Sequence, residues 1–167
     1  MIEVTSFANA HVAVFGLGRS GLATARALMA GGAEVCAWDD SPERREEAAA
    51  AGINLADLYS ANWKNMAALI LSPGVPLTHP EPHWVVRMAR AESCEVIGDV
   101  ELFAREGLPN AIAAITGTNG KSTTTALTGH LLEKCGRAVA TGGNLGTPVL
   151  ELPRLPDNGI YVIEMSS

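Results

Sequence analysis

The sequence has few charged residues, few aromatic residues and no basic excess. Charged residues make up 18% of the 167 positions, aromatic residues make up 5%, and the formal net charge is −6. A general nucleic-acid-binding protein needs a basic face, and this composition provides none. Any anionic ligand must therefore be held locally, by backbone N–H groups and a few cations. Apolar residues reach 47%, which suffices for a packed core and argues against disorder.

Long apolar runs and cysteine pairs are also missing. No run approaches the roughly 18 apolar residues of a membrane-spanning helix. The first residues, MIEVTSFANAH, lack the basic segment and apolar core of a signal peptide. The cysteines at 36, 94 and 135 form no CxxC motif, and the four histidines are interpreted as surface or packing residues. We therefore expect a cytoplasmic protein with reduced thiols and no membrane span.

Strand-like and helix-like segments alternate in the first part of the chain. Ser41 followed by Pro42 is typical of a helix start, and Thr78 with Glu81 matches a capping box that would begin another helix. This alternation favours a parallel sheet covered on both faces. The expected strands are 11–16, 33–39, 67–72 and 94–98, with INLA (53–56) as a further short candidate, and the expected helices are 20–32, 41–52 and 78–92.

The same order begins again near residue 98. A short helix is expected at 100–107, then a buried strand at 110–117, a helix at 121–135, and strands at 138–143 and 159–167. Each half therefore opens with a strand, a glycine-rich loop and a helix. We expect an α/β protein with a Rossmann-like parallel-sheet domain at 1–97, followed by the first part of a P-loop-type α/β ATPase domain at 98–167.

The first glycine loop, GLGRSG at 16–21, matches the G-x-G-x-x-G pattern after a strand and before a helix. Such a loop lets the backbone approach a pyrophosphate at the positive helix end, and Asp39 after the next strand would accept a sugar hydroxyl. The motif alone favours a nicotinamide or flavin dinucleotide. The alternative is that Gly16 and Gly21 only permit close packing. The SPGVP loop (72–76) should face the same crevice, unless it is an ordinary turn.

The second glycine loop, TGTNGKS at 116–122, is a shortened relative of the P-loop. Its N–H groups can converge on a polyphosphate, Lys121 adds a cation, and the Ser122 hydroxyl suits Mg²⁺. Glu164 ends an apolar strand, where a carboxylate needs a partner, and it is the expected second metal ligand. Asn144 follows another strand on the same side and either reaches a ligand or caps a turn.

Taken in order, these pieces resemble the Mur ligases over nearly the whole chain. GTNGKST is typical of that superfamily, whereas SPGVP with GDVELF indicates the branch that adds D-glutamate to UDP-N-acetylmuramoyl-L-alanine. The alternatives are another Mur-type ligase, a folylpolyglutamate synthase-like enzyme, and an NAD-dependent oxidoreductase that uses GLGRSG. The matching segments are GLGRSG, SPGVP, the HPE that follows it, IGDVELF, AITGTNGKST, GGNLG and VIEMSS.

The resemblance implies that the first loop holds UDP rather than NAD, and that the second holds ATP with Mg²⁺. The implied reaction of peptidoglycan synthesis, which supports cell shape and division, is ATP-driven amide formation through an acyl phosphate, with Lys121 as the catalytic cation. By the same resemblance, the UDP-sugar contacts are Arg19, Ser20, Asp39, Asp40, Ser41, Ser72, Pro73, Gly74 and Asn144, the ATP contacts are Gly117, Thr118, Asn119, Gly120, Lys121, Ser122 and Thr123, and the metal ligands are Ser122 and Glu164.

The resemblance also carries departures. The family often has an apolar residue and a threonine where Arg19 and Ser20 stand, and an arginine where Ser41 stands. Complete members have about three domains, and in them a further part of the ATPase sheet, a second metal site and a D-glutamate-binding domain follow VIEMSS. The expectation is therefore that residues 1–167 alone are inactive, and that the full-length ligase is a monomer.

Overall fold

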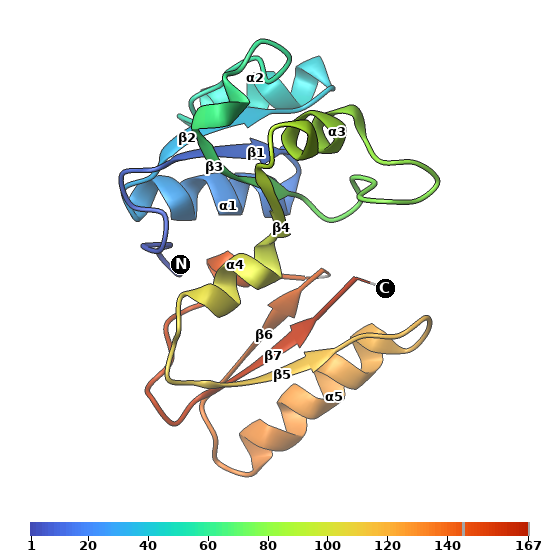
Figure 1. The fold of residues 1–167 in the computed structure, drawn as a ribbon. Helices are drawn as coiled ribbons and strands as arrows, with labels where there is room; N and C mark the ends of the chain where they lie inside the picture. The colour runs from blue at the N-terminus through green and yellow to red at the C-terminus, as the bar shows by residue number, and fades with distance from the viewer. Residues whose placement is uncertain (145, 167) are drawn as a thin grey trace.

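The fold consists of two parallel sheets with helices packed on their faces (Figure 1). The structure is a computed structural model that describes residues 1–144 and 146–166; Leu145 of GGNLG and Ser167 of VIEMSS lie outside the described residues. The first sheet has the strand order β2-β1-β3-β4 and the second β5-β7-β6. The strands within each sheet are parallel and alternate with helices along the chain, which confirms the predicted α/β fold class. None of the helices in the described residues has the length and apolar character that a bilayer crossing requires.

The first sheet is buried on both faces because the last four residues of each central strand, 12–15 of β1 and 68–71 of β3, are apolar and buried. Val12 and Val14 of β1 pack on one face with Leu28 of α1, whereas Ala13 and Phe15 pack on the other with α3. This alternation follows from the two-residue period of a strand. The elements are β1 (His11–Phe15), α1 (Arg19–Ala30), β2 (Glu34–Trp38), α2 (Pro42–Ala50), η1 (Trp63–Asn65), β3 (Met66–Leu71), α3 (Trp84–Ala91) and β4 (Glu95–Gly98).

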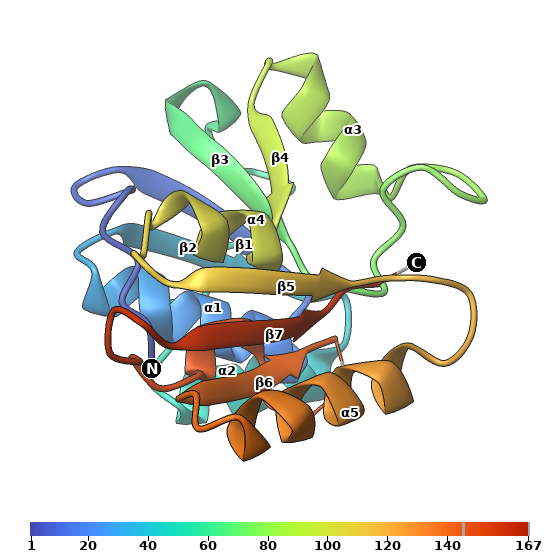
Figure 2. The same cartoon turned by 90° about the horizontal axis from the view of Figure 1, so that it is seen from below.

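The second sheet is smaller and is covered on its outer face by one long helix, α5 (Figure 2). Its other face packs toward the first sheet, with Tyr161 and Ile163 of β7 fully buried. Ile112 of β5 and Leu127 and Leu131 of α5 remain exposed. The elements are α4 (Asp99–Arg105), β5 (Ala111–Ile115), α5 (Lys121–Lys134), β6 (Val139–Gly143), η2 (Val149–Glu151) and β7 (Ile160–Glu164).

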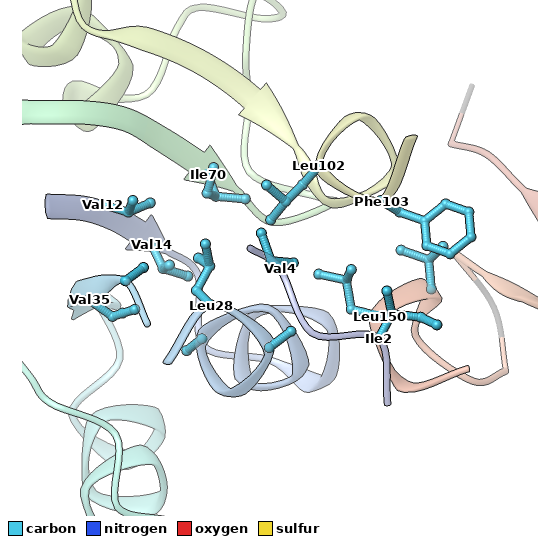
Figure 3. Packing of buried hydrophobic residues seen from close by; sticks show 14 of the residues in the cluster. Ile2, Val4, Val12, Val14, Leu28, Val35, Ile70, Leu102, Phe103 and Leu150 are labelled. Atoms are coloured by element: carbon cyan, nitrogen blue, oxygen red, sulfur yellow. The ribbon is translucent and has the colours of Figure 1, made fainter. Parts of the chain in front are cut away.

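A single hydrophobic core connects the two sheets. Ile2 and Val4 of the N-terminal segment are fully buried between Leu28 of α1, Phe103 of α4 and Leu150 of η2 (Figure 3). The backbone fixes this segment as well, because the Ile2 N–H donates to the Leu150 carbonyl oxygen at 2.8 Å. Since this core is continuous, the division into domains at residues 97 and 98 stays a prediction.

One expected helix begins in the wrong place. The capping box at Thr78 and Glu81 does not form, and α3 starts only at Trp84. Pro80 and Pro82 lack N–H donors and keep the residues before them out of the helical region, which outweighs the capping signal. The start of α2 is confirmed, because the Ser41 hydroxyl accepts from the Arg44 N–H. The INLA candidate forms only an isolated bridge, from Leu55 to Ala37.

Candidate functional site

The three glycines of the first loop do different things. Gly16 has φ +91°, and its carbonyl oxygen accepts a hydrogen bond of 2.6 Å from the Ser72 hydroxyl. A Cβ on Gly21 would overlap that same Gly16 carbonyl oxygen, so the packing of α1 against the loop requires glycine there. A Cβ on Gly18 would meet no atom of the described residues within 4 Å. Gly16 and Gly21 therefore serve packing, and the open space lies at Gly18, where α1 begins.

Asp39 holds this loop in place from the end of β2. Its Oδ2 accepts from the Leu17 N–H at 2.6 Å, and its Oδ1 accepts from the Ser41 N–H at 2.9 Å. Arg44 lies 3.4 Å from Oδ2, and Asp39 as a whole is only 5% exposed. The carboxylate thus ties the glycine loop to the start of α2, a role that the sequence analysis did not anticipate. Its contact with a sugar hydroxyl stays a prediction.

A cavity of about 400 Å³ opens beside this loop. Of the nine residues expected to contact a UDP-sugar, Asp39, Asp40 and Ser41 are not part of its wall. Arg44 is part of the wall although sequence reasoning missed it. The available signal was the helix start at Ser41, which puts Arg44 in the first turn of α2. The wall consists of Gly16, Gly18, Arg19, Ser20, Gly21, Arg44, Ser72, Pro73, Gly74, Val75 and Asn144.

Asp40 and Ser41 take part in local structure next to the cavity. The Asp40 carboxylate accepts from Trp84 Nε1 at 3.2 Å and lies 3.1 Å from His83 Nε2. The Ser41 hydroxyl donates to Glu43 Oε2 at 2.6 Å while it caps α2. These contacts connect the β2–α2 loop to the start of α3.

The second glycine loop leads into α5 with two glycines at positive φ, Gly117 at +145° and Gly120 at +76°. Gly120 provides no side-chain cap for α5, so the first N–H groups of the helix face outward without an acceptor from the helix itself. Lys121 Nζ donates to the Gly117 carbonyl oxygen at 2.6 Å. The cavity at this helix end has about 330 Å³ and is lined by Thr118, Asn119, Gly120, Lys121, Ser122, Thr123, Asn144 and Glu164.

Glu164 supplies the carboxylate of this second cavity. It ends β7 and is 2% exposed, and its Oε1 has no hydrogen-bond partner among the described residues. A buried carboxylate oxygen without a partner is costly unless a cation or water binds there. Within the described residues, no group of three or more acidic, histidine or cysteine side chains is arranged so that it could hold a metal ion. One carboxylate and the Ser122 hydroxyl nevertheless fit Mg²⁺, because this ion keeps several waters and takes few protein ligands.

Asn144 lines both cavities. Its N–H donates to the Glu164 carbonyl oxygen at 2.9 Å, which joins the end of β6 to the end of β7. Gly143 permits this approach, since it has φ +120° and a Cβ there would overlap the Glu164 backbone. The two glycine loops therefore open onto adjacent cavities that share one side chain.

The chain matches two family models in sequence order. Residues 10–98 match the Mur ligase MurD-like N-terminal domain, and residues 115–167 match the Mur ligase middle domain. The chain therefore belongs to the Mur ligase family. Within that family, its N-terminal region is of the MurD-like type.

Curated relatives agree with this assignment. The chain is 56% identical to a UDP-N-acetylmuramoylalanine–D-glutamate ligase of Caulobacter sp. strain K31, 58% identical to that of Rhizobium meliloti, and 59% identical to that of Rhodopseudomonas palustris. Each comparison covers 100% of this chain but only 36% or 37% of the relative. The chain thus spans little more than a third of the length of these relatives.

Proposed function

We propose that this chain carries the UDP-substrate site and part of the ATP site of a ligase that adds D-glutamate to UDP-N-acetylmuramoyl-L-alanine. The activity is that of the curated relatives, and the chain covers only the first part of them. The observation that carries the proposal is the pair of adjacent cavities that share Asn144. A ligase of this kind must bring a substrate carboxylate to a nucleotide phosphate, and two neighbouring anion sites meet that need.

The first cavity suits the diphosphate of the nucleotide-sugar. Arg19 and Arg44 contribute positive charge, and the start of α1 at Gly18 contributes N–H groups. Ser72 and Asn144 add polar groups for the sugar–peptide end. Asp39 acts indirectly, because it fixes the loop that presents these groups. The UDP-sugar contacts at Ser20, Pro73, Gly74, Asp40 and Ser41 remain part of the proposal.

The second cavity suits the phosphates of ATP. Residues 118–123 line it, and together with Gly117, which is not part of the wall, they would surround the phosphates, with N–H groups of the α5 start and Lys121 as donors. Ser122 and Glu164 would hold Mg²⁺, and the unpartnered Oε1 of Glu164 supports this role. Bound there, ATP would supply the phosphoryl group that activates the substrate carboxylate for amide formation, and Mg²⁺ would offset the charge on its phosphates. Lys121 would steady the negative charge that develops on the phosphates.

The test uses the protein encoded by the full reading frame. It is supplied with ATP, Mg²⁺, UDP-N-acetylmuramoyl-L-alanine and D-glutamate, and amide product and released phosphate are measured together. Both should form in equal amounts and depend on every component. Replacement of D-glutamate by L-alanine, L-lysine or meso-diaminopimelate separates this branch from other Mur ligases, since only D-glutamate should give product.

The oxidoreductase alternative has its own readout. Calorimetric titration with UDP-N-acetylmuramoyl-L-alanine and with NADH should give binding of the first only. Binding of NADH without response to the UDP-sugar would overturn the proposal. The cytoplasmic location, the monomeric state and the absence of nucleic-acid binding stay predictions, to be checked by fractionation, light scattering and filter binding.

A further inference from the structure

The wall of the first cavity is positive although the chain as a whole is acidic. The net charge of the sequence is −6. The wall nevertheless includes two cations, Arg19 and Arg44, and no carboxylate among the described residues. Asp39 lies behind the wall, where its oxygens accept from two backbone N–H groups and, at 3.4 Å, from Arg44 Nη1. With Arg19 and the start of α1 added, the wall retains a local positive charge that favours an anion.

Both arginines lie at helix N-termini, a position that is unfavourable for a cation. Arg19 is the first residue of α1, and Arg44 lies in the first turn of α2. The N-terminus of a helix carries partial positive charge, so a cation there is unfavourable unless an anion is nearby. For Arg44, Asp39 offsets part of this cost, but at 3.4 Å and with 56% of the Arg44 side chain exposed the pair is loose. Within the described residues, the Arg44 guanidinium makes only this one hydrogen bond, which leaves further N–H donors beside the cavity.

The two arginines reach the cavity from different helices. Arg19 comes from α1, which starts at the glycine loop, and Arg44 comes from α2, which starts after Asp39. A single phosphate would occupy the α1 start near Gly18, where the space is open. Two linked phosphates are longer and can engage a second donor on the neighbouring helix. A guanidinium is well suited to this because it binds phosphate oxygens in a fork.

We propose that Arg44 is a specificity-determining residue that makes the first cavity select a nucleoside diphosphate over a nucleoside monophosphate. Neither the family resemblance nor the matched relatives assign Arg44 this role. The inference rests on the proposed function, since it names the residue that reads the second phosphate of the same ligand. Arg19 and the α1 start hold the phosphate nearer the glycine loop.

Calorimetry on the protein encoded by the full reading frame tests the inference with UDP and UMP as ligands. Wild type should bind UDP more tightly than UMP. Arg44→Ala should lower the affinity for UDP by roughly tenfold or more, which is the size of a lost charge-assisted contact. It should lower the affinity for UMP by less than about threefold. The UDP affinity of Arg44→Lys should lie between those of wild type and Arg44→Ala, because lysine keeps the positive charge but cannot donate two parallel hydrogen bonds to a phosphate. Arg26→Ala removes an exposed arginine of α1 outside the cavity wall and should bind both ligands as wild type does.

The outcomes separate the inference from the proposal beneath it. Wild-type protein that binds neither UDP nor the UDP-sugar contradicts the proposed function itself. Wild type that binds UDP, with Arg44→Ala showing the same ratio of UDP to UMP affinity, overturns the role of Arg44 alone. Melting curves accompany each variant. Should Arg44→Ala fail to fold, Arg44→Gln decides, because it keeps most of the side-chain length and a polar end.

Discussion

The Leu17 N–H donates to the Asp39 carboxylate at 2.6 Å, across the gap between the first glycine loop and the end of β2. The same carboxylate accepts from the Ser41 N–H at 2.9 Å, at the start of α2. One buried acid therefore fixes the two backbone segments that frame the first cavity. The acid that was expected to contact a ligand thus also organises the groups around the cavity.

Asp39→Asn should destabilise the protein by about 1–3 kcal/mol, because its amide group cannot accept from both N–H groups and leaves one of them unpaired. Urea denaturation measures the change, and UDP affinity should fall with it because the loop loses its support. Asp157→Asn changes an exposed aspartate and is the control; its free energy of unfolding should stay within about 0.5 kcal/mol of the wild-type value. An Asp39→Asn protein as stable as wild type would mean that the two hydrogen bonds contribute nothing to the fold.

Alanine substitution should lower the stability of the protein at Gly21 but only its UDP affinity at Gly18. Gly21→Ala forces a Cβ onto the Gly16 carbonyl oxygen, which is backbone and cannot move aside, and should cost about 3 kcal/mol. Gly18→Ala meets open space at an ordinary φ of −71° and should melt near wild type. Its methyl group would however narrow the approach to the α1 start and weaken UDP binding. Thermal melts and UDP titration of both variants distinguish packing from binding, and equal melting temperatures would refute the distinction.

Glu164→Gln should leave stability unchanged or raise it slightly. The substitution keeps the shape but removes a buried charge whose Oε1 has no partner. If Glu164 holds Mg²⁺ as proposed, the Mg²⁺-dependent activity of the protein encoded by the full reading frame should fall by about 10²-fold, because the charge on the ATP phosphates would be less well offset. Chemical denaturation and a Mg²⁺ titration of turnover give the two readouts. A clear loss of stability with normal Mg²⁺ dependence would assign Glu164 a structural role instead.

In the protein encoded by the full reading frame, Lys121→Ala should lower kcat by roughly 10²-fold or more, because under the proposed function it removes a donor that would stabilise developing phosphate charge. Its hydrogen bond to the Gly117 carbonyl oxygen is charge-assisted but only partly buried, so the free energy of unfolding should fall by no more than about 1.5 kcal/mol. Lys134→Ala, at the exposed end of α5, is the matched control and should keep normal turnover. Near-normal kcat of Lys121→Ala at saturating ATP would contradict its role.

Local signals account for the parts of this fold that the sequence predicted. Each glycine loop lies between a buried apolar run and a helix, and Ser41 with Pro42 marks a helix start, so the α/β order follows from neighbouring residues. The helix expected at 78–92 forms only from Trp84 onward, because two local signals conflict in residues 78–83. Thr78 and Glu81 favour a helix start at this point, whereas Pro80 and Pro82 prevent helix formation there.

The remaining features depend on contacts between distant residues. The burial of Ile2 against Leu150 cannot be derived from either segment alone. The position of Arg44 in the cavity wall requires the orientation of α2 relative to the glycine loop, which its own sequence does not specify. The internal role of Asp39 likewise appears only when β2 is placed beside β1. Sequence therefore located the glycine loops, whereas tertiary packing decides which side chains face the cavities.

Glu106 joins the N-terminal segment to the end of α4 through four hydrogen bonds. The N–H and hydroxyl groups of Thr5 and Ser6 all donate to its carboxylate, including a Thr5 N–H contact of 2.8 Å. Burial raises the pKa of Glu106, but the hydrogen bonds from Ser6 and Thr5 together outweigh it and leave the pKa below the ordinary value of 4.5. The lowered pKa means that the folded state favours the ionised form.

This gives a pH dependence with a defined sign. The stabilising contribution of Glu106 is present above pH 4.5, the ordinary value, and is lost as the pH falls through the lower folded-state pKa. Glu106→Gln should be less stable than wild type at pH 7, by no more than about 1 kcal/mol because solvent screens this partly exposed group, and the gap should close toward pH 3. Urea denaturation of both proteins from pH 3 to 7 measures it. Glu133→Gln, on the exposed side of α5, should show no such convergence. A gap between wild type and Glu106→Gln that stays constant over this range would show that the ionised carboxylate does not hold the N-terminal segment.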